Sequence, residues 1–132
     1  MKRVLLTLVV IAVVLIATVW TLLLFHERSC YQNTVYSERF SLDAYSRVKA
    51  GMPRSAVIEL LGAPLKAEQD GAYPVWAIQD EAIRKRFGGA ETIALDFLMF
   101  SQPKDHLHDF NWVQVSVGPD GTVVATRNCI TD

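Results

Sequence analysis

The sequence predicts an α+β protein in which an N-terminal transmembrane helix precedes two short helices packed on one face of a three- to four-stranded antiparallel sheet. Three observations favour this class. An uncharged apolar run occupies residues 4–25, apolar residues recur with helical spacing over 42–61, and strand-like alternation dominates after residue 72. Consecutive strands with short turns favour antiparallel pairing, and two helices suffice to cover one face of such a sheet. The predicted domains are a transmembrane anchor over residues 1–25, a linker over 26–40 and an α+β domain over 41–132.

The apolar run predicts a single-pass membrane anchor. Residues 4–25 contain no charge, glycine or proline, and as a helix they would extend about 33 Å, enough to cross a ~30 Å hydrocarbon core. A cleaved signal peptide and a buried soluble helix are the alternatives, but the run is longer than a signal-peptide core and no small-residue cleavage site follows it. Lys2 and Arg3 predict an N-in, C-out orientation in the inner (cytoplasmic) membrane, with the rest of the chain in the periplasm.

The two cysteines fit an oxidising compartment. Cys30 follows the apolar run and Cys129 lies near the C-terminal end of the sequence. We expect them to form one disulfide that ties the two ends of the domain together. A loop of about 100 residues would gain up to ~4–5 kcal/mol in the chain-entropy model. Two free thiols, or lipid attachment at Cys30, are the alternatives.

The charge and the absence of catalytic motifs argue against two classes of function, nucleic-acid binding and catalysis. The formal net charge is −1, and the residues after the anchor carry −3, because Lys2 and Arg3 are the only charged residues among the first 25. No basic stripe is present, so a nucleic-acid partner is not expected. No Gly-x-Ser-x-Gly elbow and no plausible Cys–His pair occurs. We therefore predict neither an enzyme nor a cofactor.

Glycine and proline punctuate two predicted short helices. Ser41 is placed to cap the first helix, and Gly51 and Gly62 are placed to end the first and second. Pro53 can begin the second helix because its missing N–H would be unpaired there, and Pro64 prevents its continuation. The remaining motif positions are Met52 and Val57, which can staple the helix start, and Leu60 and Leu61, which join Val57 on the buried face.

The rest of the chain alternates as strands do. We predict strands over 72–78, 91–100, 111–117 and 122–128. Residues 80–89 are expected to form either a short helix, with Asp80 as its cap, or an irregular excursion. In the 91–100 strand, Asp96 is expected on the solvent side. The residues expected to share the inner face are Ile93, Leu95, Phe97 and Met99.

Two further residue groups are candidate sites. Trp112, Gln114 and Ser116 alternate with inward-facing valines, so they share the second face of the sheet, where a protein partner could dock. His106 and His108, in the segment KDHLHDF, are the weaker candidates for metal ligands. The alternative is that the segment is a solvated polar loop that holds no metal. We favour this alternative and expect no metal there.

The helix motif resembles the SmpA/OmlA (BamE-like) family of small envelope proteins. The resemblance is carried by Tyr45, Val48 and the motif from Gly51 to Pro64, followed by the Trp76 segment, and it is looser over 111–128. It implies a two-layer sandwich, which β-lactamase-inhibitor-like domains share, and for BamE itself a role in outer-membrane β-barrel assembly. The sequence departs from the family at Pro53, where a Ser or Thr cap is usual, and in the residues before Cys30, which do not form a lipobox.

The resulting hypothesis is a non-enzymatic, membrane-anchored protein-interaction module of the envelope, whose partner is another envelope protein. A periplasmic domain that senses a ligand or metal through the His106/His108 loop is the alternative.

Overall fold

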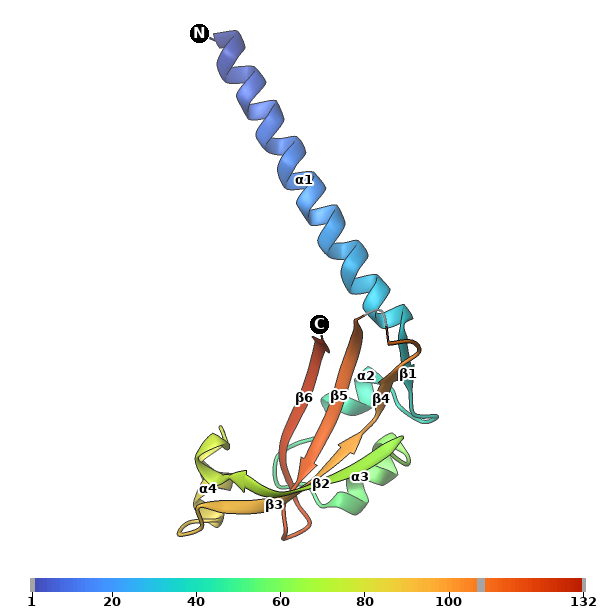
Figure 1. Ribbon diagram of the computed structural model, residues 1–132, viewed down its shortest axis with the longest axis vertical. Coiled ribbons are helices and arrows are strands. Elements are labelled where there is room, and N and C mark those ends of the chain that lie inside the picture. The colour runs from blue at the N-terminus through green and yellow to red at the C-terminus, as the bar shows by residue number, and fades with distance from the viewer. Residues whose placement is uncertain (1, 107–108, 132) are drawn as a thin grey trace.

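The computed structural model describes residues 2–106 and 109–131. It confirms the α+β class, with a long apolar helix followed by antiparallel strands (Figure 1). The elements in chain order are α1 (Lys2–Gln32), β1 (Thr34–Tyr36), α2 (Leu42–Ser46), α3 (Arg54–Leu61), β2 (Lys66–Pro74), the 3₁₀ helix η1 (Val75–Ala77), α4 (Glu81–Arg86), β3 (Thr92–Met99), β4 (Ser101–Pro103), β5 (Phe110–Val117) and β6 (Val123–Thr131).

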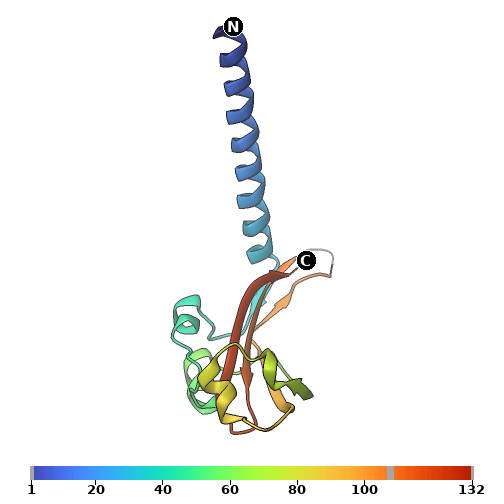
Figure 2. The ribbon, with the colours of Figure 1, turned by 90° about the vertical axis from the view of Figure 1, so that its left-hand side faces the viewer.

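Helix α1 projects from one end of the domain, close to the start of β5 (Figures 1 and 2). Its side chains from Val4 to Phe25 are exposed, and it is long and apolar enough to cross a membrane. The segment 26–40, predicted to be a linker, is instead largely ordered secondary structure. Its first residues complete α1, and β1 then pairs antiparallel with β4. The reason is burial: Asn33 and Thr34 are 8% and 5% exposed and hydrogen-bond to Asp109, just before β5, and to Asn111, within β5.

The helix-hairpin motif forms largely as predicted. The Ser41 hydroxyl accepts from the Ala44 N–H and caps α2, although α2 ends at Ser46, before the predicted glycine stop. Gly51 and Gly62 adopt φ of 83° and 80°, which is a region that favours glycine. The turn around Gly51 also pairs with the start of β6, since the Gly51 N–H donates to the Val123 carbonyl and the Val123 N–H to the Met52 carbonyl. This pairing fixes the helix pair against the sheet.

The main sheet has four antiparallel strands in the order β2-β3-β5-β6. The first strand was predicted over 72–78, but β2 runs from Lys66 to Pro74 and η1 follows it. Val75 and Ile78 are both buried, and their spacing of three residues suits one helical turn rather than a strand.

Each face of the sheet has its own hydrophobic core. Helices α2 and α3 lie on the first face (Figure 2). They pack on Leu98, Phe100 and the inward valines of β5, and Val57 and Leu61 are fully buried. On the second face, η1 and α4 cover Ile93, Leu95 and Val124. The prediction that helices cover one face alone was therefore incomplete.

Strand β3 contributes to both cores, which corrects the position of Asp96. Leu98 and Phe100 share the first face with Asp96, because side chains two residues apart point the same way. Asp96 was predicted on the solvent side, but it lies under the start of α3, with its Oδ2 atom 2.6 Å from the Nη1 atom of Arg54.

Candidate functional site

A groove of about 700 Å³ lies on the second face of the sheet, beside the region that α4 covers. One wall comes from Tyr73 of β2 and from residues 77–80, which run from η1 to the start of α4. Residues 124–127 of β6 form the other wall. The floor is made by Leu95 and Phe97 of β3 with Gln114 and Ser116 of β5. We call this feature the second-face groove.

The structure brings the three predicted partner-face residues together. The Trp112 Nε1–H donates to the Gln114 side-chain oxygen at 2.9 Å, and the Gln114 amide nitrogen donates to the Ser116 hydroxyl at 3.2 Å. Gln114 and Ser116 line the groove, while Trp112 lies next along the strand with its ring 5.6 Å from that of Phe110. Ser116 is only 6% exposed, so it supports the floor rather than reaching toward a partner.

The groove has charges of opposite sign on its two walls. Arg127 of β6 is exposed and lies opposite Gln114 in the strand register. Its Nε–H donates to the Cys129 sulfur at 3.2 Å. Asp80 stands on the other wall and uses its Oδ1 atom to cap α4, accepting from the Ile83 N–H at 3.1 Å. The groove therefore offers a cation, an anion, an amide and the aromatic ring of Phe97 within one concave surface.

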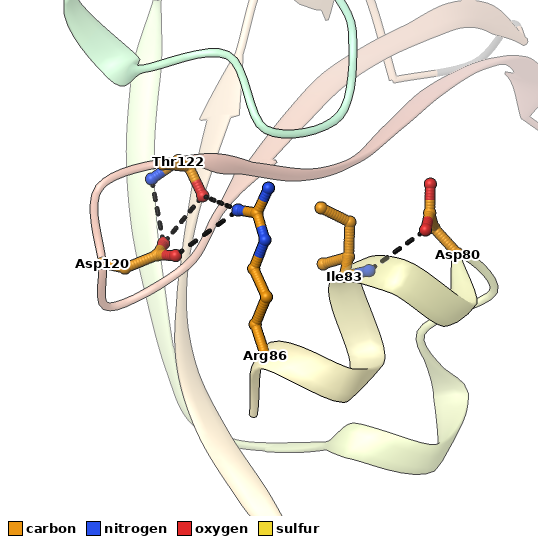
Figure 3. Close-up of polar contacts among 5 residues, drawn as sticks. All are labelled: Asp80, Ile83, Arg86, Asp120 and Thr122. Carbon is orange, nitrogen blue, oxygen red and sulfur yellow. Dashed lines mark hydrogen bonds and ion pairs between the residues drawn. The ribbon is translucent and has the colours of Figure 1, made fainter. Parts of the chain in front are cut away.

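Arg86 ties the α4 wall to the turn between β5 and β6. Its Nη1 atom donates to the Thr122 hydroxyl at 3.2 Å and lies 3.8 Å from the Asp120 carboxylate, while that carboxylate accepts from the Thr122 N–H and hydroxyl (Figure 3). With the Asp80 cap at the other end of α4, these contacts hold the short helix at both termini. Such fixed walls reduce the ordering cost of binding.

Tyr45 supports the floor of the groove from the first face. Its hydroxyl donates to the Gln114 carbonyl at 3.4 Å. Burial raises the pKa of Tyr45 to about 12; a hydrogen bond with Thr126 opposes this, and the nearby Cys129 adds a smaller increase. The hydroxyl thus stays protonated and keeps its role as a donor below that pH.

The predicted disulfide is not formed in the structure. Cys30 and Cys129 both lie in the described part of the chain, and no bond joins them. Cys30 is buried on α1, where its sulfur lies 3.7 Å from His26 Nε2, whereas the Cys129 sulfur accepts from Arg127 on the sheet. Of the predicted metal candidates, His106 is exposed after β4, and His108 lies outside the described residues.

Several groove residues were missed by sequence reasoning. The position of Arg127 could have been predicted, because alternation along β6 places it on the same face of the sheet as Gln114. Tyr73 and the 77–80 wall carried no such signal, because their position depends on η1 and α4 folding over the second face.

The second-face groove is thus the candidate functional site of the domain. No protein-family model, curated protein or solved structure matches the chain. What can be proposed rests on the geometry of the groove, on α1 and on the resemblance of the helix-hairpin motif.

Proposed function

We propose that the chain is a non-enzymatic, single-pass inner-membrane protein whose periplasmic α+β domain binds another envelope protein through the second-face groove. One observation carries this proposal. Helices α2 and α3 cover the first face, whereas η1 and α4 cover only part of the second, and the groove lies beside that part.

The composition of the groove favours a protein partner. Arg, Trp and other aromatic side chains are enriched where protein interfaces concentrate binding energy, and charged rims fix the register of the partner. Arg127 and Asp80 supply the charged rim, and the Phe110–Trp112 pair extends the aromatic surface beyond the groove. We propose binding rather than catalysis because the Ser116 hydroxyl is bonded to the Gln114 amide, which is not a base.

The proposed location rests on α1. Its exposed apolar length matches a bilayer, and Lys2 and Arg3 precede it, which favours the N-in orientation. The resemblance of the helix hairpin to BamE-like proteins favours a partner in outer-membrane or envelope assembly. A topology reporter fused after Asp132 should be active in the periplasm; activity confined to the cytoplasm would refute the orientation.

Site-specific photo-crosslinking tests the binding proposal. A crosslinking amino acid replaces Arg127 in the groove of the full chain, expressed in its native membrane. The matched control places it at Glu59, which is exposed on α3. We expect a discrete crosslinked protein from position 127 that is absent from position 59. Equal products from both positions, or a product from position 59 alone, would contradict the proposed face.

A further inference from the structure

A cluster of metal-ligating side chains lies where α1 meets the domain. His26 and Cys30 are four residues apart on α1, so they share one face of the helix. Asp109 joins them from the residue before β5. His26 Nε2 lies 3.4 Å from Asp109 Oδ2 and 3.7 Å from Cys30 Sγ, and one potential ligand atom of each residue lies within 4.8 Å of the others.

The two separations from His26 match the edges of a metal coordination tetrahedron. With Zn–S near 2.3 Å and Zn–N and Zn–O near 2.1 Å, ideal tetrahedral angles place ligand atoms roughly 3.3–3.6 Å apart. The 3.4 and 3.7 Å separations from His26 therefore need little adjustment, and the third separation, between the Cys30 sulfur and the Asp109 carboxylate, is at most 4.8 Å. An ion pair between His26 and Asp109 would not by itself require the Cys30 sulfur to lie beside the same two side chains.

The surrounding contacts hold the ligands in place. The Asn33 side chain donates to the Asp109 carbonyl and accepts from the Asp105 N–H, both at 3.3 Å. The Thr34 hydroxyl donates to the Cys30 carbonyl at 2.7 Å and accepts from the Asn111 N–H at 2.8 Å. These contacts reach the backbone carbonyls of Cys30 and Asp109, so they fix the main chain that carries two of the three side chains. They also hold Asp105 and Asp109 against the end of α1.

We propose that His26, Cys30 and Asp109 bind a divalent transition-metal ion of the zinc class, with the fourth position open to water or another ligand. A thiolate and an imidazole favour zinc over calcium or magnesium, which prefer oxygen ligands. On binding, the Cys30 thiol loses its proton to solvent and its sulfur becomes the ligand. His26 directly follows the apolar run, so the ion would hold the membrane anchor against the domain. It would thereby fix the orientation of the second-face groove relative to α1.

The site differs from the His106/His108 pair predicted from the sequence, and it competes with the predicted disulfide, because an oxidised Cys30 cannot serve as a thiolate ligand. Cys30 is 1% exposed and Cys129 is half-buried. Cys30 can be a metal ligand or part of a disulfide, but not both at once, and experiment can distinguish the two states.

Cobalt(II) titration of the full chain tests the proposal. The protein is purified in detergent without a histidine tag and under reducing conditions. We expect one cobalt ion per chain, a thiolate-to-cobalt charge-transfer band, and loss of that band when zinc is added. The matched controls are Cys129→Ser and His106→Ala, which should leave the band unchanged.

The ligand variants decide the result. Cys30→Ser should abolish the band, and His26→Ala should weaken binding at least about tenfold, because even the loss of an outer contact costs roughly 10–100-fold. The His26 side chain is 51% exposed, so its replacement should leave the fold intact, as circular dichroism can verify. Absence of the band in the reduced native chain, unchanged cobalt affinity in a folded His26→Ala variant, or loss of the band in Cys129→Ser would each overturn the proposal. So would isolation of the chain from its own membrane with Cys30 bonded to Cys129.

Discussion

Replacing Gly62 with alanine should destabilise the domain more than any other glycine-to-alanine change of similar backbone geometry. Gly62 ends α3 with φ of 80° and ψ of −172°, a region that only glycine adopts readily and that costs other residues about 1–3 kcal/mol. A Cβ atom there would lie 2.8 Å from the Arg39 Cβ. Because a Cβ cannot rotate away, the backbone must shift, which adds roughly 1 kcal/mol or more. We expect a total loss of about 2–4 kcal/mol.

Urea unfolding of the full chain in detergent, followed by near-ultraviolet circular dichroism, measures this loss. Gly121→Ala is the matched control, since Gly121 has φ of 76° but nothing within 4 Å of the added Cβ; strain alone predicts about 1–2 kcal/mol there. Arg39→Gly removes the colliding Cβ, so a double-mutant cycle should recover the steric part. Equal losses at positions 62 and 121, or a cycle without coupling between Gly62 and Arg39, would refute the reasoning.

Three further predictions concern the α4 wall of the groove, the ion pair under α3 and the tyrosine below the groove floor. Asp80→Ala should cost about 1 kcal/mol through the lost α4 cap and raise hydrogen exchange over 81–86, whereas unchanged exchange would mean that the cap does not hold this wall. A double-mutant cycle of Arg54→Met and Asp96→Asn should give a coupling of about 0.5–1 kcal/mol for this partly exposed pair, and zero coupling would contradict its placement. Tyr45 ionises near pH 12 when folded but near 10 when unfolded, so its contribution is complete below about pH 10 and lost as the pH rises through about 12. Tyr45→Phe should therefore flatten the alkaline fall in stability, and an identical pH profile would refute this.

The sequence predicted the elements that are specified locally. The apolar run predicted α1, and the helical spacing with Gly51, Pro53 and Gly62 predicted the hairpin, because caps and backbone geometry depend on residues close together in the chain. Trp112, Gln114 and Ser116 were placed on one face for the same reason. Strict alternation with the inward valines determines their side of β5.

The elements that were missed depend on tertiary contacts. Strand β2 begins with KAEQD, which is almost entirely exposed, so no apolar alternation marks it as a strand. Asp96 was expected in solvent because its face of β3 was taken as uncovered, whereas α2 and α3 pack on that face. The cluster of His26, Cys30 and Asp109 was missed because α1 was expected to end at the membrane boundary. The helical spacing of His26 and Cys30 was present, but the approach of Asp109 was not visible in the sequence.

Affinity capture with a blocked groove tests the central claim most directly. Ala125 is exposed and lines the second-face groove, so Ala125→Arg fills the groove without removing a buried side chain. Ala63→Arg is the control, because Ala63 is exposed after α3 and does not line the groove. The full chain captured from native membranes should retain a stoichiometric envelope protein in the native and Ala63→Arg forms and lose it in Ala125→Arg. Retention of the same partner by a folded Ala125→Arg chain would contradict binding through the groove.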